Sequence, residues 1–161
     1  MTDARYGRNC SLRLIVVGAV KEEYYRNKIK EYVQSIRKRQ EIDLIELRDE
    51  SIPQKAGDSI LDSIKEREGM RIMEHITPQD YVIALCIDGR AATGDTLRKN
   101  MVKARERGAR SVTLVIGGSL GLSEAVIKRA DYRLSFSQMT FPHQLMRVML
   151  LEQLMQVICD K

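Results

Sequence analysis

Short apolar runs alternate along the chain with longer segments in which apolar residues recur every three or four positions. The short runs predict strands at 12–18, 41–47, 80–87, 111–117 and 132–137. The periodic segments predict helices at 21–40, 59–76, 97–110 and 122–130, and a last helix that begins at Pro142. Strands and helices that alternate this regularly predict an α/β fold, in which helices cover both faces of a mostly parallel sheet.

The apolar stripes of the first two helices indicate which residues face the core. In helix 21–40 the stripe contains Tyr25, Ile29, Tyr32, Val33 and Ile36. In helix 59–76 it contains Ile60, Ile64, Ile72 and Ile76, and Asp58 is a candidate cap for the amino end of that helix.

The last predicted helix is apolar around nearly its whole circumference. Its sequence over 142–158, "PHQLMRVMLLEQLMQVI", has too many apolar positions for one stripe, so the helix must be buried on more than one side. A central core helix would explain this pattern. We favour a homodimer, because a single small domain has little room for a helix that is covered twice.

Length and composition indicate one domain in a reducing compartment. A chain of 161 residues can form a single core; we assign 12–161 to one domain and expect 1–11 to be a disordered extension. No apolar run approaches the roughly 18 residues of a membrane span. Cys10, Cys86 and Cys159 are scattered and lack C-x-x-C spacing, which argues against disulfides and structural zinc. We therefore expect a cytoplasmic protein without a metal site.

The net charge of +5 is concentrated in 89–133, which has ten basic and four acidic side chains. Many of the basic side chains belong to predicted helix 97–110, where Leu97, Met101 and Ala104 would face the core and the Arg and Lys side chains would face solvent. A solvated helix face is the simpler interpretation, and a nucleic-acid patch remains open.

The stretch "VIGGSLGL" at 115–122 places three glycines directly after a predicted strand. It lacks the lysine of a P-loop, and the glycines do not match G-x-G-x-x-G, which argues against a phosphate loop and against a nicotinamide-dependent oxidoreductase. Two interpretations remain. The stretch is either a ligand loop at the carboxyl end of a parallel strand, where glycine allows close approach, or a plain turn capped by Ser119 or Ser123.

Three late motifs resemble one known family. They are "LCIDGR" (85–90), "VIGGSLGL" (115–122) and "LSFSQMTFPHQLMRVMLLEQ" (134–153), supported by "VVGAVKEEYY" and "KEREGMRIM". Together they resemble the RlmH family, SPOUT-class methyltransferases that act on N3 of a pseudouridine in large-subunit ribosomal RNA. The resemblance covers 12–154, which is nearly the whole chain.

The resemblance implies a parallel sheet with helices on both faces, a C-terminal trefoil knot and a homodimer that methylates 23S ribosomal RNA in the assembled ribosome. General folding rules alone would argue against a knot, because threaded connections are rare. The methyl donor would be S-adenosyl-L-methionine, a sulfonium that has no phosphate to cradle. The cofactor-binding residues implied by the motifs are Leu85, Gly117, Phe136, Ser137, Gln138, Met139, Thr140 and Phe141.

Two further residues of the third motif are candidates for catalysis. N3 of pseudouridine is a weakly acidic imide that must lose its proton, and His143 is the nearest titratable group in the motif. Arg147 lies one helical turn further on the same face, where it would anchor either an RNA phosphate or the helix. Without the resemblance, a helix-end histidine and a surface arginine would be the simpler interpretation.

The sequence departs from the family near its end. After "LLEQ" the resemblance implies a Tyr-Arg-Ala-like segment and a basic tail with Tyr-His that is thought to reach the active site of the dimer. In this sequence the place of the Tyr-Arg-Ala-like segment is taken by Met155, Gln156 and Val157, and no Tyr or His follows them. An alternative therefore stays open, namely a weak or inactive homologue that binds S-adenosylmethionine or RNA without turnover.

Overall fold

The computed structural model describes residues 10–159, which form one five-stranded sheet with helices on both faces. The strands are β1 (Ser11–Val17), β2 (Ile42–Leu47), β3 (Asp80–Ala91), β4 (Ser111–Ile116) and β5 (Tyr132–Ser135). The helices are α1 (Glu23–Arg37), α2 (Asp58–Glu74), α3 (Gly94–Glu106), α4 (Glu124–Arg129) and α5 (His143–Cys159). The strand order is β2-β1-β4-β3-β5 and every pairing is parallel, which confirms the predicted α/β fold.

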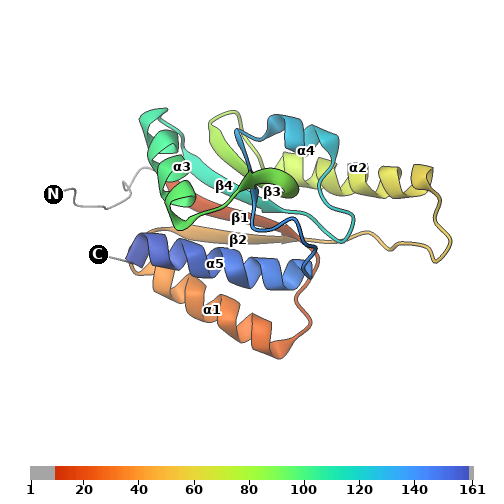
Figure 1. The fold of residues 1–161 in the computed structure, drawn as a ribbon, viewed down its shortest axis with the longest axis horizontal. Helices are drawn as coiled ribbons and strands as arrows, with labels where there is room; N and C mark the ends of the chain where they lie inside the picture. Colours follow the sequence, from red (N-terminus) through yellow and green to blue (C-terminus); the bar gives the residue numbers. More distant parts are fainter. Residues whose placement is uncertain (1–9, 160–161) are drawn as a thin grey trace.

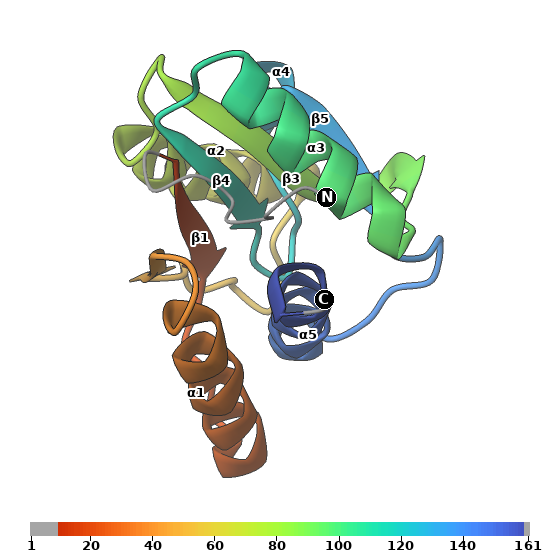
Figure 2. The same cartoon turned by 90° about the vertical axis from the view of Figure 1, so that its left-hand side faces the viewer.

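The helices form two layers around the sheet (Figures 1 and 2). Alternating residues of β1 show how the strands serve both layers: Leu12, Leu14 and Val16 pack with α1, α3 and α5, whereas Ile15 and Val17 pack with α2 and α4. A strand buried on both faces needs apolar residues at every position, because successive side chains point to opposite faces. The unbroken apolar runs in the sequence therefore have a direct structural cause.

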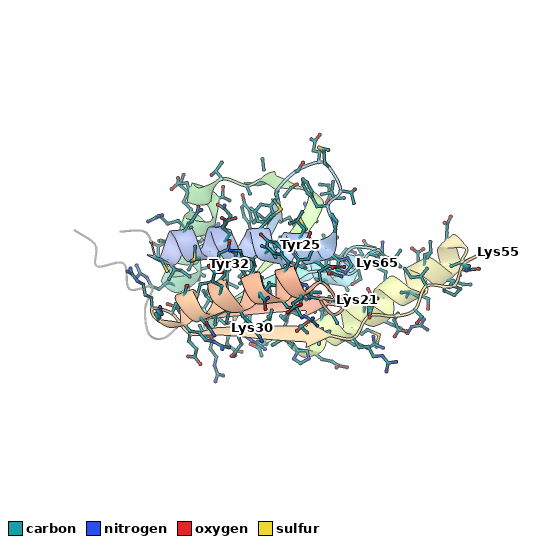
Figure 3. The ribbon with its side chains drawn as sticks, turned by 90° about the horizontal axis from the view of Figure 1, so that it is seen from below. Lys21, Tyr25, Lys30, Tyr32, Lys55 and Lys65 are labelled. Atoms are coloured by element: carbon teal, nitrogen blue, oxygen red, sulfur yellow. The ribbon has the colours of Figure 1, made fainter. Side chains whose placement is uncertain are left out.

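Helix α5 lies in the same layer as α1 and also contacts α3 (Figure 2). Figure 3 views this layer from outside, with Tyr25 and Tyr32 on the α1 side. Seven residues of α5 are buried, and they are Arg147, Val148, Leu150, Leu151, Leu154, Val157 and Ile158. On the outer side, Leu145 and Met149 remain half-buried and Gln156 is exposed. The described chain thus covers most of α5, while an apolar outer edge remains.

A buried polar network lies at the amino edge of the sheet, where the strands begin. Asp80 accepts a 2.8 Å hydrogen bond from the Ser111 hydroxyl and contacts Arg13 Nη1 at 3.4 Å. The Ser111 hydroxyl also lies 2.9 Å from that of Thr113. The buried side chains of this network are hydrogen-bonded, which offsets the cost of removing them from water, and the network joins the starts of β1, β3 and β4.

Several local expectations were wrong. Asp58 does not cap α2, because it is the first helical residue and Gly57 occupies the cap position. Ile60 is 46% exposed, since the first turn of α2 extends beyond the sheet (Figure 1), whereas Ile64 and Ile72 are buried as predicted. Pro142 precedes α5 as its cap and accepts the Met146 N–H, so the helix begins one residue later than expected.

At the amino end, Ser11 is already part of β1 and pairs with Ser111, although residues up to 11 were expected to form the extension. Residues 1–9 lie outside the described part of the chain, and so the expected disorder stays a prediction. The trefoil knot also stays a prediction. Among residues 10–159, no helix is long and apolar enough to cross a bilayer.

Candidate functional site

A cavity of about 650 Å³ lies where the ends of β3, β4 and β5 meet. Its walls come from 85–88 within β3, 116–122 at and beyond the end of β4, 134–137 at and beyond the end of β5, and 139–143 up to the start of α5, together with Ile127 and Met146. The volume is in the range of sites that bind small organic ligands. The cavity also lies outside the carboxyl ends of parallel strands, the usual ligand position in open α/β sheets.

The glycine loop after β4 is folded back on itself at the cavity wall. Gly121 has φ +82° and donates its N–H to the Gly118 carbonyl at 3.0 Å. A Cβ on Gly117 would lie 2.7 Å from the carbonyl carbon and oxygen of Gly121, so only glycine fits there. Ser123 caps α4 by accepting the Val126 N–H. Both interpretations of this stretch therefore hold in part: it lines a cavity and ends in a capped turn.

The segment between β5 and α5 forms the outer wall. Phe136, Ser137, Met139, Thr140 and Phe141 line the cavity, as do Leu85 and Gly117. Seven of the eight residues implied for cofactor binding are thereby brought together. Gln138 is exposed and does not line the cavity, and a role for it in binding stays a prediction.

His143, Arg147 and Asp49 gather around Gly18, at the end of β1. Gly18 has φ +92°, and a Cβ placed on it would lie 3.6 Å from His143 Nε2 and 3.8 Å from both Arg147 Nη2 and Asp49 Cγ. Burial and the nearby Arg147 lower the pKa of His143, and the Asp49 carboxylate opposes the shift. A half-buried imidazole of lowered pKa is neutral at neutral pH and can accept a proton. His143 also lines the cavity, so this proton acceptor faces the cavity interior.

Arg147 is only 1% exposed and fastens α5 to the end of β1. Its Nη2 donates hydrogen bonds to the carbonyl oxygens of Val17 at 2.9 Å and Gly18 at 2.6 Å, and Nη1 lies 3.3 Å from a Glu46 carboxylate oxygen. Burial lowers the pKa of the guanidinium, and Glu46 opposes that change. The surface-arginine interpretation is wrong, whereas these contacts match the anchoring of the helix.

The charges of the cavity wall distinguish between classes of ligand. Asp88 is an acidic lining residue, and no Lys or Arg belongs to the lining of the described cavity. Burial and the neighbouring Asp88 raise the pKa of Cys86 to about 11, so its thiol is neutral and poorly suited as a nucleophile. Phosphate sites require cations or rows of N–H donors. This wall suits an uncharged or cationic organic ligand instead.

Comparison with known proteins agrees with this geometry. The family model described as "Predicted SPOUT methyltransferase" matches residues 10–159. The chain belongs to the SPOUT methyltransferase family. It is 47% identical over 143 residues to a Bifidobacterium adolescentis protein named "Ribosomal RNA large subunit methyltransferase H", covering 89% of this chain and 90% of the relative. It is 45% identical over 144 residues to a protein of the same name from Clostridioides difficile, covering 89% and 91%.

A solved structure shares the fold at low sequence identity. The crystal structure of a probable methyltransferase from Bordetella pertussis Tohama I superposes with a TM-score of 0.57 and 12% identity, covering 96% of this chain and 98% of that one. Such a similarity concerns the fold alone. It agrees with the five parallel strands of this SPOUT methyltransferase and with the helices on both faces of the sheet.

Sequence reasoning did not identify several residues of the site in this SPOUT methyltransferase. Ile87 and Asp88 extend the wall beyond Leu85, and they belong to a quoted motif that could have indicated them. Asp49 and Glu46 gave no such signal, because acidic residues at the end of an edge strand are normal on a solvated surface. Their roles depend on α5 lying beside the end of β1, which no local pattern specifies.

Proposed function

We propose that the chain is an S-adenosylmethionine-dependent methyltransferase that methylates N3 of a pseudouridine in 23S ribosomal RNA of the assembled ribosome, in the cytoplasm. The observation that carries this proposal is the cavity formed by β3, β4 and β5 and the segments after β4 and β5, which has apolar walls, a folded glycine loop and no Lys or Arg among its described lining residues. The names of the relatives support the choice of large-subunit ribosomal RNA.

The residues present fit the cofactor. Leu85, Phe136 and Phe141 offer apolar surface for an adenine ring, and the backbone at Gly117 allows close contact. The acidic Asp88 and the lack of lining cations suit a ligand with positive charge. When bound, S-adenosylmethionine supplies an electrophilic methyl group on its sulfonium sulfur.

The side chains at the Gly18 end of the cavity would handle the acceptor. Neutral His143 would take the proton from N3 of pseudouridine, since burial keeps the imidazole unprotonated. Asp49 would stabilise the imidazolium that results, because it favours the protonated form of His143. Arg147 would act indirectly by holding the first turns of α5, and hence His143, against Gly18. Alignment of the reacting atoms would supply much of the rate.

We further propose that the protein works as a homodimer through the layer formed by α1 and α5. The outer edge of α5 carries the apolar residues Leu145 and Met149, and Tyr24 on α1 is 67% exposed. Large apolar side chains at a surface favour association.

The basic side chains of α3, such as Arg98 and Lys99, are exposed and would attract the RNA backbone.

Calorimetric titration with S-adenosylhomocysteine tests the cofactor site, since this product should bind without reacting. We expect saturable binding, near one site per chain or per dimer. Incubation with S-adenosylmethionine and ribosomes that lack the modification, followed by mass spectrometry of the RNA, then tests turnover. Binding followed by methylation supports the proposal, and binding without methylation favours the alternative of an inactive homologue. Absence of binding would contradict the proposed cofactor site and leave only an inactive homologue that binds RNA.

A further inference from the structure

Glu68 lies behind the glycine loop with its carboxyl group buried. Helix α2 carries it, and the residue is only 5% exposed. Its Oε1 accepts a 3.0 Å hydrogen bond from the backbone N–H of Glu50, in the segment that follows β2. Its Oε2 is buried and has no hydrogen-bond partner within residues 10–159. An unpaired buried oxygen is costly, so its position calls for a reason beyond packing.

The unpaired oxygen faces the cofactor side of the structure. A Cβ placed on Gly118 would lie 3.1 Å from Glu68 Oε2 and 3.6 Å from Oε1. Gly118 belongs to the cavity wall, and its carbonyl group closes the turn by accepting the Gly121 N–H. Glu68 therefore touches the glycine loop from behind, at the residue where that loop turns.

The same carboxyl group reaches the acceptor end of the site. Through the Glu50 N–H it holds the backbone next to Asp49, and Asp49 lies with His143 and Arg147 around Gly18. One side chain of α2 thus contacts both the glycine loop and the segment that carries Asp49. Neither contact places Glu68 in the cavity itself.

The groups that face Glu68 determine its ionisation. Burial raises the pKa of its carboxyl group and the Glu50 N–H opposes the rise. The carboxylates of Asp49 and Glu50 raise the pKa of Glu68 further, and Arg71, on the same helix, lowers it. From α5, His143 and Arg147 face Asp49, whose carboxylate acts electrostatically on both of them. A protonated carboxyl group has a hydroxyl hydrogen, which gives the otherwise unpaired oxygen the ability to donate toward the loop.

We propose that Glu68 is a positioning residue for the cofactor: its buried carboxyl group ties the glycine loop at Gly118 to the segment at Glu50 and so fixes two walls of the site together. This inference rests on the proposed cofactor function. In the neutral acid, Oε1 can accept the Glu50 N–H while a hydroxyl on Oε2 is available to donate toward the loop. Ionisation removes the donor and places a buried negative charge beside the loop, so affinity for the cofactor product falls as the pH rises through the pKa of Glu68.

The test is calorimetric titration of the full-length protein with S-adenosylhomocysteine across a pH series. The variants are Glu68→Gln, which keeps an acceptor and a donor without titrating, and Glu68→Ala, which removes both. Glu66→Gln is the matched control, because Glu66 is an exposed residue of the same helix. His143 titrates equally in the wild type and in Glu68→Gln, so the difference between their profiles isolates Glu68.

For the wild type and Glu66→Gln, we expect affinity to fall by roughly three- to tenfold from low to high pH, the equivalent of about one hydrogen bond. Glu68→Gln should lack this component, and Glu68→Ala should bind weakly at every pH. If Glu68→Ala does not fold, the comparison of wild type with Glu68→Gln decides. Identical pH profiles for these two proteins overturn the inference. A wild type that binds no S-adenosylhomocysteine overturns the cofactor proposal itself, and this inference with it.

Discussion

The Arg147 guanidinium donates a 2.6 Å hydrogen bond to the carbonyl oxygen of Gly18, the residue that follows β1. Because the same guanidinium nitrogen also binds the Val17 carbonyl, the first turns of α5 are fastened to the end of β1, an interior strand of the sheet. His143 lies one turn earlier on the same face of α5. The attachment therefore holds the backbone of His143 at the cavity wall.

Replacement of Arg147 by Met should lower the free energy of unfolding by about 2–4 kcal/mol, because two buried carbonyl groups lose their donor. Urea denaturation measures this change. Arg98→Met is the control, since Arg98 is an exposed residue of α3, and it should change stability by less than about 0.5 kcal/mol. Equal effects of the two substitutions would contradict an anchoring role for Arg147.

Replacement of Gly117 by Ala should weaken binding of S-adenosylhomocysteine by at least about tenfold, because the new methyl group forces the Gly121 backbone to move. The overpacking should also cost about 1–3 kcal/mol of stability. Gly94→Ala is the control, since nothing lies within 4 Å of a Cβ at that position. Calorimetry and thermal unfolding measure the two effects, and unchanged affinity would reduce the loop to a plain turn.

The protonation of His143 should respond to its two charged neighbours in opposite directions. Asp49→Asn should lower the pKa of His143 further, and Arg147→Met should raise it, since the two wild-type side chains act in these opposite senses. NMR titration of the imidazole Cε1–H measures both shifts. Asp43→Asn, an exposed site on β2, should leave the value in place. If Asp49→Asn leaves the pKa of His143 unchanged, the Asp49 carboxylate has no electrostatic role at the site.

The lowered pKa of His143 also affects stability. The unfolded chain binds a proton at this side chain more readily than the folded chain, so the free energy of unfolding falls as the pH drops from the ordinary value of 6.5 toward the folded-state pKa. His143→Gln should remove this component from a pH series of urea denaturation curves. An unchanged slope between wild type and variant would show that burial does not disfavour the imidazolium.

Association of two chains should depend on the outer edge of α5. Sedimentation equilibrium at micromolar concentration should detect a dimer of the wild type. Met149→Arg should weaken it by at least about tenfold, since a charge would enter an apolar contact. Gln156→Arg is the control, because Gln156 is a polar, exposed residue further along the same edge. This substitution should weaken the dimer less than Met149→Arg does. A monomeric wild type would refute the proposed dimer.

The alternation of apolar runs and helical stripes was enough to predict all five strands, all five helices and the parallel sheet. A strand that is covered by helices on both faces, such as β1, must be apolar on both faces, which gives a clear signal in the sequence. The exact ends of the elements were predicted less well, since α2 and α5 each begin one residue away from the expected position. Ile60 fits a helical stripe perfectly well, but the first turn of α2 extends past the sheet and leaves it exposed. Periodicity identifies the face of a helix without giving the extent of the surface that covers it.

The candidate site was predictable only where a motif lies in one stretch of sequence. Leu85, Gly117 and the segment at 136–141 came from such motifs, and most of them line one cavity. Asp49 and Glu68 were not predicted, because their positions depend on how the segment after β2 and helix α2 pack behind the glycine loop. The burial of Arg147 had the same cause, since a charged residue in an apolar helix looks exposed until its partners are known.

The network of Arg13, Asp80 and Ser111 occupies the end of the strands opposite to the cavity. All strands run in the same direction, and six residues of strand separate the two regions by about 20 Å. Substitutions in the two regions should therefore combine additively. Variants selected for thermostability at one edge and variants selected for a new acceptor preference at the other can therefore be combined without screening every pair of substitutions.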